Sequence, residues 1–381
     1  MPESTEIAPI RLAQLTTLRT GGTPARMFEA RTADEAVAAL RETWDAGDEW
    51  FVLGGGSNLF VGDEPFDGTV VRLLTRGIQT LPSPRDGYAR LRVEAGHSWD
   101  DVVAHAVAHG LAGIEALSGI PGTAGAAPVQ NVGAYGQEIV QTLVGVDLLD
   151  EDTGEVSRVP ADELGLGFRT SVLKHHYGSE PQRRAVILSL TLELEQRGDA
   201  AVPVPGAQLR TALGLQPGDA VTLAHVRETI LAVRAGKGMV LDDADPDTYS
   251  AGSFFQNAVV PASFARTLPA ECPRWPVAPE VQHTRVIPLE QYAGLAPLPA
   301  AAEPDVKVSS AWLIEHAGFR KGFRLPRSRA GLSAKHALAL TNRGGATAAE
   351  LAELARYIRI RVHSEFGLLL QPEPVLIGVE I

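Results

Sequence analysis

Residues Ser118–Gly136 read SGIPGTAGAAPVQNVGAYG, and this stretch decides the fold that we expect. It carries five glycines, four alanines and two prolines, and it has no acidic, basic or cysteine side chain. Residues this small let a flat or bulky ligand lie directly against the backbone. Gln130 and Asn131 add amide donors and acceptors for the edge of a heteroaromatic ring. The stretch therefore predicts a ligand-binding loop whose chemistry must come from other residues.

A second glycine-rich stretch precedes this one in the chain. The residues EWFVL, 49–53, predict a buried strand that runs directly into GGGSN, Gly54–Asn58. Consecutive backbone N–H groups in such a turn can surround an anion. The stretch has neither the dinucleotide fingerprint Gly-x-Gly-x-x-Gly nor the lysine of a nucleotide-triphosphate loop, so taken alone it also fits an ordinary turn. Two such loops in one chain, however, could hold a pyrophosphate and the flat ring attached to it.

Composition limits the classes of protein to consider. The chain has 381 residues, which predicts two or three domains. Its formal net charge of −12, without a basic block, argues against binding to nucleic acid. The single cysteine, Cys272, excludes an internal disulfide and a cysteine-rich metal site, and we expect no metal. No signal-peptide pattern and no stretch of about 18 apolar residues is present, so we expect a soluble, cytoplasmic protein without a membrane partner.

Capping patterns and hydrophobic periodicity predict the main elements. Helices are expected after Thr32, Ser98 and Thr347, each of which is followed three residues later by an acidic residue. AVILSLTLELEQ, 185–196, is expected to form a strand with one apolar face and mostly polar residues on the other. Residues 152–154, Asp-Thr-Gly, are expected to form the turn of a hairpin.

Two patterns suggest catalysis but fit better as structural features. His105 and His109 lie one helical turn apart, but the glutamate of the zinc motif and a third ligand are missing. Ser171–Lys174 matches the Ser-x-x-Lys of penicillin-recognising enzymes without the companion motifs. We discount both patterns, although Lys174 could help to bind an anionic ligand.

Three other residues leave a structural and a functional interpretation open. Ser253, between Gly252 and two phenylalanines, is either a hydrogen-bonded core serine or a hydroxyl held rigidly enough to donate a proton. Arg169 in GFRTS could bind a carboxylate through two parallel hydrogen bonds. Glu373, flanked by two prolines, is either a rigidly placed carboxylate or part of an edge-strand turn.

Taken together, these motifs resemble the family of UDP-N-acetylenolpyruvoylglucosamine reductases. The match runs in order along nearly the whole chain: TLRTGG, LGGGSNLF, SGIPGTAGAAPVQNVGAYGQEI, GFRTSVLK, KGMVLD, SAGSFFQN, VSSAWLIEHAGFRKG, ALALTNRGG and LLLQPEPVLIG. The resemblance implies an α+β fold, with a two-part FAD-binding domain of the vanillyl-alcohol-oxidase type and a C-terminal α/β substrate-binding domain. We expect the three units to span residues 1–75 together with 371–381, then 76–228, and then 229–370.

The resemblance also implies a cofactor and the residues that bind it. FAD would be bound non-covalently, because no histidine or cysteine suggests a covalent link, and NADPH would be the co-substrate. The residues expected to bind FAD are Gly54, Gly55, Gly56, Ser57, Asn58, Pro121, Gly122, Thr123, Gly125, Ala126, Gln130, Asn131 and Gly133.

In the reaction implied by the resemblance, NADPH reduces FAD, and a hydride then passes to the methylene carbon of UDP-N-acetylglucosamine enolpyruvate. The product is UDP-N-acetylmuramate, made in a cytoplasmic step of peptidoglycan precursor synthesis. Ser253 would protonate the neighbouring carbon, Arg169 would stabilise the carboxylate, and Glu373 would be a polarising or acid partner. Lys237 and Asn257 would bind the anionic substrate. We expect small-molecule partners only, and a monomer.

The sequence departs from the family pattern at two places and leaves two other functions open. Phe168 stands where many relatives have tyrosine, and PVPGAQL, 203–209, has Gly206 near the place of a tyrosine that stacks on the nucleotide. An oxidase of the same FAD-fold superfamily would use oxygen instead of NADPH. A non-catalytic FAD-binding module would need both glycine loops, but not Ser253, Arg169 and Glu373 together.

Overall fold

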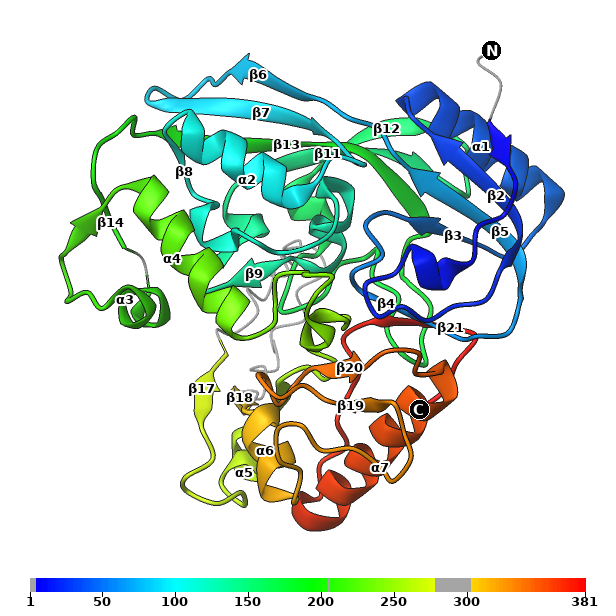
Figure 1. The fold of residues 1–381 in the computed structure, drawn as a ribbon. Helices are drawn as coiled ribbons and strands as arrows, with labels where there is room; N and C mark the ends of the chain where they lie inside the picture. Colours follow the sequence, from blue (N-terminus) through cyan, green and yellow to red (C-terminus); the bar gives the residue numbers. More distant parts are fainter. Residues whose placement is uncertain (1–4, 205, 278–302) are drawn as a thin grey trace, which may run out of the picture.

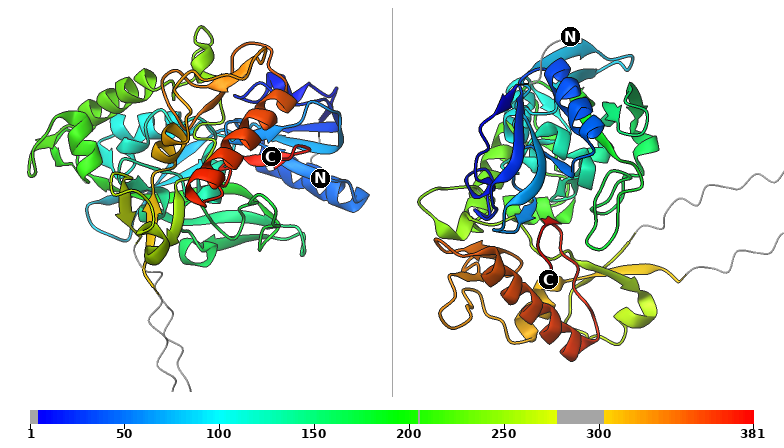
Figure 2. Two further views of the ribbon diagram at one scale, coloured as in Figure 1. Left: turned by 90° about the horizontal axis from the view of Figure 1, so that it is seen from below. Right: turned by 90° about the vertical axis from the view of Figure 1, so that its right-hand side faces the viewer.

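The computed structural model describes residues 5–204, 206–277 and 303–381. Parts of two predicted units, residues 1–4 and 278–302, lie outside these ranges, as does Pro205 of the PVPGAQL stretch. The chain forms an upper part that contains the N-terminal strands and a lower part that contains helix α7, Ala348–Phe366 (Figure 1). Figure 2 shows the same two parts from two further sides.

The N-terminal strands form a sheet in the order β1-β2-β5-β3, in which β2, β5 and β3 are parallel. Helix α1, Ala33–Ala46, connects β2 to β3. It begins where predicted, because the Thr32 side chain accepts a hydrogen bond from the Glu35 N–H. The late strand β21 pairs in parallel with β4 of this region. The strands are β1 Glu6–Ile7, β2 Pro24–Ala30, β3 Trp50–Leu53, β4 Leu59–Val61, β5 Phe66–Leu73 and β21 Val375–Ile377.

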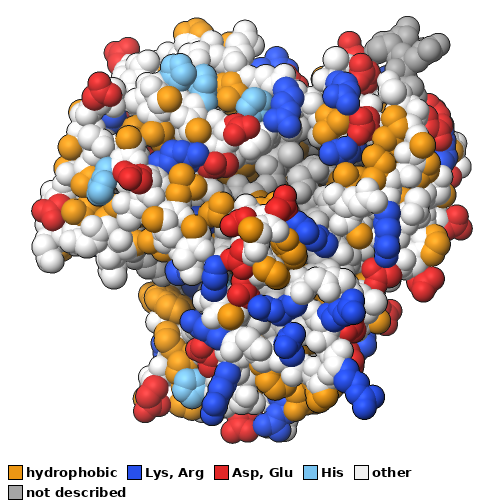
Figure 3. Space-filling model, viewed as in Figure 1, with side chains coloured by type: hydrophobic (Ala, Val, Ile, Leu, Met, Phe, Trp, Pro, Cys, Tyr) orange, Lys and Arg blue, Asp and Glu red, His pale blue; other side chains and the backbone are white. Residues whose placement is uncertain are grey.

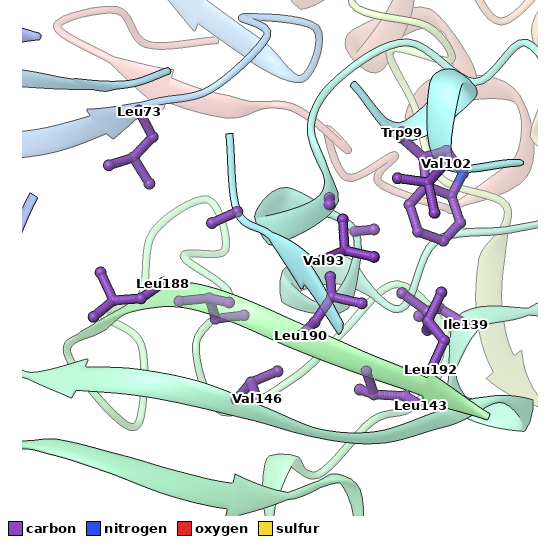
Figure 4. Packing of buried hydrophobic residues seen from close by; sticks show 14 of the residues in the cluster. Leu73, Val93, Trp99, Val102, Ile139, Leu143, Val146, Leu188, Leu190 and Leu192 are labelled. Carbon is purple, nitrogen blue, oxygen red and sulfur yellow. The ribbon is translucent and has the colours of Figure 1, made fainter. Parts of the chain in front are cut away.

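The middle of the chain forms an antiparallel sheet in the order β12-β11-β13-β7-β6, and β8 also pairs with β13. Helix α2, Trp99–Ala108, begins at the predicted cap Ser98 and packs on this sheet. Figure 4 shows the buried side chains between them, among them Val93, Trp99, Leu190 and Leu192. The strands are β6 Ile78–Pro82, β7 Tyr88–Glu94, β8 Leu111–Ala112, β11 Leu143–Asp150, β12 Val156–Pro160 and β13 Ala185–Gln196.

Strand β13 has the predicted bounds and the predicted apolar and polar faces, but both faces are buried over much of their length. Its apolar residues are buried as expected, yet Ser189 and Thr191 on the opposite face are also only 2% and 5% exposed. The Ser189 hydroxyl donates to Asp147, and Arg92 bonds both residues, so polar side chains of the neighbouring strands cover this face. The alternation of polar and apolar residues in one strand does not show whether neighbouring strands supply polar partners that cover its polar face.

In its described residues, the lower part contains a small antiparallel sheet in the order β16-β18-β17, the hairpin β19-β20 and helices α5, α6 and α7. Helix α7 has the complete predicted capping box between Thr347 and Glu350. The elements are β16 Ala258–Pro261, α5 Ala262–Ala265, β17 Arg274–Pro276, β18 Asp305–Val308, α6 Ser310–His316, β19 Ala330–Leu332 and β20 Leu340–Asn342.

The remaining elements are helix α4 and several short strands and helices. Helix α4, Leu223–Gly236, packs against α2 and leads from the upper part to the lower. The remaining short strands and helices are β9 Gly133–Ala134, β10 Gln137–Glu138, β14 Val202–Pro203, α3 Ala207–Leu213 and β15 Ala220–Val221. The 3-10 helices are η1 Leu12–Gln14, η2 Glu115–Leu117, η3 Ala124–Ala126, η4 Pro128–Gln130, η5 Ile139–Gln141, η6 Ala161–Leu164 and η7 Pro246–Thr248. The boundaries of the three expected units stay a prediction.

Candidate active site

The two glycine-rich loops lie against each other, although a long stretch of chain separates them. The Ser57 hydroxyl donates to the carbonyl oxygen of Pro121 at 3.0 Å, and the Asn58 amide donates to the Gln130 side chain at 2.8 Å. A Cβ atom at Gly55 would lie only 2.7 Å from the Cα of Gly122, so the contact between the loops requires glycine at position 55. The two loops therefore form a single binding element.

This element lines a cavity of about 640 Å³, which is within the usual size of a ligand pocket. Strand ends from β3, β13 and β21 complete the wall. The cations Lys174, Arg183 and Arg184 also lie along it. Most residues predicted to bind FAD are on the wall: Gly54, Gly55, Gly56, Ser57, Asn58, Pro121, Gly122, Thr123, Gly125, Ala126 and Gln130. Paired loops of small residues with nearby cations fit a pyrophosphate that carries a flat ring.

Asn131 and Gly133 do not line this cavity. Asn131 is 1% exposed and has a positive φ of 44°. Its amide nitrogen donates to the carbonyl oxygen of Gly167 and to the Glu138 carboxylate, both at 2.9 Å. Asn131 therefore holds the loop that carries Arg169, and the cofactor role that we predicted for it and for Gly133 stays a prediction.

Arg169 and Glu373, which are far apart in sequence, form an ion pair. The distance from Arg169 Nε to Glu373 Oε1 is 2.9 Å, and their side chains are 21% and 13% exposed. Arg169 also donates to the carbonyl oxygen of Gly133 at 3.0 Å. Its φ of 54° lies in the left-handed region, which a non-glycine residue adopts at a cost. The surrounding contacts therefore hold this guanidinium in a fixed place.

The backbone segment that follows Ser253 pairs with the segment that carries Glu373. The Glu373 N–H donates to the carbonyl oxygen of Phe254 at 2.9 Å, and Phe255 forms a bridge with Pro372. Phe254 and Phe255 are fully buried, whereas Ser253 keeps part of its surface exposed. The fold thus brings the three predicted catalytic residues into one region, in which two buried phenylalanines directly follow the serine in sequence.

The two predicted substrate residues are placed differently. Lys237 is exposed at the end of α4, and its Nζ lies 5.7 Å from the ring centre of Tyr135. Tyr135 follows the β9 strand whose Gly133 accepts from Arg169. Asn257 accepts a hydrogen bond from the Ser310 N–H at 3.1 Å, which fixes the first turn of α6. In Figure 3, Lys and Arg side chains gather along the boundary of the two parts and over the lower part.

Sequence reasoning missed Lys307 near this region, and it missed the burial of Lys174. Lys307 of β18 lies 4.7 Å from the Phe168 ring centre, and burial lowers the pKa of its amine. We discounted the Ser-x-x-Lys motif but kept Lys174 as a residue that could help to bind an anionic ligand, and it is buried and lies on the cavity wall. No local pattern around either lysine indicates burial, because the covering residues come from distant segments.

The histidines give no sign of a metal centre. The rings of His105 and His109 are 4.0 Å apart, and burial lowers the pKa of His105. In the part of the chain that the structure describes, no three His, Cys, Asp or Glu side chains are grouped to hold a metal ion. The described helices also include none with the length and apolar character that crossing a membrane would need.

Two protein-family models match this chain, one in each half of the sequence. Residues 24–160 match an FAD binding domain, and residues 245–377 match the C-terminal domain of UDP-N-acetylenolpyruvoylglucosamine reductase. A UDP-N-acetylenolpyruvoylglucosamine reductase of Leifsonia xyli is 50% identical over 384 aligned residues, covering 98% of this chain and 99% of that protein. The chain belongs to the UDP-N-acetylenolpyruvoylglucosamine reductase family. It is an FAD-dependent oxidoreductase of that family.

Other members of the reductase family agree with this assignment. The enzyme of that name from Saccharopolyspora erythraea is 50% identical, covering 96% of this chain and 94% of that protein. The crystal structure of the reductase from Thermus caldophilus has a TM-score of 0.60, at 23% identity, covering 98% of this chain and all of that one. The predicted α+β fold, with an FAD-binding domain followed by the reductase C-terminal domain, is confirmed.

Proposed function

We propose that the protein reduces UDP-N-acetylglucosamine enolpyruvate to UDP-N-acetylmuramate, with NADPH as the source of the hydride. The observation that carries this proposal is the Arg169–Glu373 ion pair beside the Ser253 segment, which Lys174 of the cavity wall joins through a hydrogen bond to the Glu373 carbonyl oxygen. A module that only bound FAD would have no use for this group of side chains. Family membership supplies the identity of the substrate.

When bound non-covalently, FAD would accept two electrons from NADPH and pass them on to the enol ether. Hydride addition to the methylene carbon leaves a pair of electrons on the carbon that carries the ether oxygen and the carboxylate. The Arg169 guanidinium, which is held by Gly133 and Glu373, is placed to stabilise that carboxylate. Ser253 donates the proton that completes the new C–H bond. Glu373 then keeps Arg169 oriented and is a polar partner for the serine.

A flavin titration tests the proposal. The purified protein should be yellow, NADPH should bleach it under argon, and the enolpyruvyl sugar nucleotide should restore the colour. Colour restored by oxygen but not by the sugar nucleotide would instead identify an oxidase. A yellow protein that NADPH does not bleach would indicate a module that binds FAD but does not catalyse this reaction.

Lys237→Ala should weaken the binding of both NADPH and the sugar nucleotide, if both enter one cleft. We expect each KM to rise about tenfold, the effect of losing one hydrogen bond to a charged group, with a smaller change in kcat. Steady-state kinetics with each substrate varied would measure this, and Arg361→Ala on the exposed face of α7 is the control. An unchanged KM for either substrate, or a complex that holds both at once, would contradict a shared cleft.

The proposal also covers the cellular location of the reaction and the oligomeric state of the protein. We place the reaction in the cytoplasm as a step in the synthesis of peptidoglycan precursors, where its sugar-nucleotide substrate would be found. We also propose that the protein is a monomer with small-molecule partners only. Light scattering after gel filtration would test the second point.

A further inference from the structure

Lys174 is a buried cation that the proposed reaction does not use. Its side chain is only 2% exposed, and it lies on the cavity wall. The ammonium group has three donors, and one of them bonds the backbone carbonyl oxygen of Glu373 at 2.9 Å. The nearby Glu373 carboxylate is paired with Arg169 instead. A buried charge without a carboxylate partner is costly, so a lysine at this position needs a reason.

The charges around Lys174 allow its protonation to respond to a ligand. Burial lowers the pKa of its amine to about 8, with Glu373 raising it and Arg169 lowering it. His176, whose own pKa is lowered by burial and by Lys174, faces it from the same segment. Near neutral pH the amine is mostly charged, and above pH 8 it is mostly neutral. An added negative charge in the cavity would raise its pKa again.

The position of Lys174 identifies the part of the cofactor that it would meet. Lys174 is one hydrogen bond from Glu373, and Glu373 is one hydrogen bond from the residue after Ser253. Hydride transfer has to occur where these residues gather. The lysine therefore lies at the end of the cavity where the redox-active ring belongs, and not where an adenosine would lie.

We propose that Lys174 is a further functional residue of the flavin site, whose ammonium group faces the flavin ring and stabilises the reduced form. Addition of a hydride brings two electrons and one proton to the neutral ring, which then carries one negative charge. The lysine cation offsets that charge and so raises the reduction potential. This inference rests on bound FAD and on the reaction centre placed above, but on neither substrate. The competing explanation is that Lys174 only anchors the backbone at Glu373.

The reduction potential of the holoenzyme tests this inference. Titration with a chemical reductant and a reference dye, without NADPH or sugar nucleotide, gives the potential for wild type, Lys174→Met and Lys174→Arg. We expect Lys174→Met to shift the equilibrium at least tenfold toward oxidised flavin, which is about 30 mV for two electrons. Lys174→Arg keeps the charge and should stay within threefold of wild type. So should Lys321→Met, which removes an exposed lysine that does not line the cavity. A Lys174→Met potential within threefold of wild type would overturn the inference.

The pH dependence of the wild-type potential gives a test that needs no variant. Below pH 8 Lys174 is already charged in the oxidised enzyme, so reduction takes up only the one proton that goes to the flavin ring. Above pH 8 the Lys174 amine is neutral in the oxidised enzyme and becomes protonated when the flavin is reduced. Reduction should therefore take up one more proton above pH 8 than below it, and Lys174→Met should lack this change. A wild-type potential without the extra proton overturns the inference even if the methionine variant cannot hold flavin.

Melting of the flavin-free proteins separates the two roles of Lys174. An anchoring lysine predicts that flavin-free Lys174→Met melts below wild type while its potential is unchanged. The electrostatic role predicts an unchanged or higher melting temperature, because a buried charge is removed. If the wild-type protein is yellow but shows neither the expected dependence of its potential on Lys174 nor the extra proton uptake, the lysine inference is rejected and the proposed function stands. A wild-type protein that binds no flavin rejects the proposed function.

Discussion

Ser253→Ala is expected to leave the reduction of bound FAD by NADPH near its wild-type rate. The second half-reaction, in which the enolpyruvyl substrate reoxidises the flavin, should slow by about 10²–10⁴-fold, the usual effect of removing a placed general acid. Hydride transfer from NADPH needs no proton donor at this position. Protonation of the substrate carbon does need one, and the fold holds Ser253 between Gly252 and the buried Phe254, beside Glu373.

Stopped-flow absorbance can follow each half-reaction of Ser253→Ala separately. Ser263→Ala is a matched control, because Ser263 is exposed on α5 and its hydroxyl donates to the Glu303 carboxylate at 2.6 Å. Equal slowing of both half-reactions would indicate that Ser253 only supports the structure of the flavin site. Unchanged reoxidation would move the proton donor elsewhere, and Glu373 would be the next candidate.

Gly125→Val is expected to give a protein that is purified without its yellow colour. Gly125 lines the cavity on one side and packs against Ala95 on the other. A Cβ atom at position 125 would lie 2.6 Å from the Ala95 Cβ and 3.1 Å from its Cα. The Gly125 N–H also donates to the Ala95 carbonyl oxygen at 2.8 Å. A valine must therefore displace the second loop, at a cost of about 1–3 kcal/mol or more.

The ratio of flavin to protein absorbance measures this effect, after circular dichroism has shown that the variant is folded. Gly236→Val is the control, because a Cβ at the end of α4 meets no atom within 4 Å and φ is not positive there. Full FAD occupancy in a folded Gly125→Val protein would contradict the placement of the second loop. The sequence suggested that glycine lets the ligand approach the backbone, whereas the structure shows that the neighbouring strand end also requires it.

Local rules predicted the elements of this fold more completely than the arrangement of its site. Thr32, Ser98 and Thr347 each cap the helix expected after them, because a cap depends on residues within one turn. The alternating pattern predicted a polar face on β13, but it did not predict that side chains from β7 and β11 cover this face. Such coverage depends on strands that pair across the sheet, which periodicity in one strand cannot show.

The candidate site shows the same limit. Motifs identified Arg169 and Glu373, but only the fold shows that they form an ion pair. Gln130 and Asn131 are adjacent amides with the same chemistry, yet Gln130 faces the cavity and Asn131 faces the Arg169 loop. The left-handed backbone at Asn131 turns its side chain to the other side. Lys174 was undervalued because burial is a property of the whole fold.

The pairing of β21 with β4 has a consequence for synthesis on the ribosome. Leu59–Val61 of β4 emerges early, whereas Val375–Ile377 of β21 follows only after almost all of the described chain has been translated. The same late segment supplies Val375–Gly378 of the cavity wall. A nascent chain therefore exposes both glycine loops well before it can enclose a flavin. Flavin capture must wait until translation has passed this segment, so bound flavin reports a chain that was made and folded through β21.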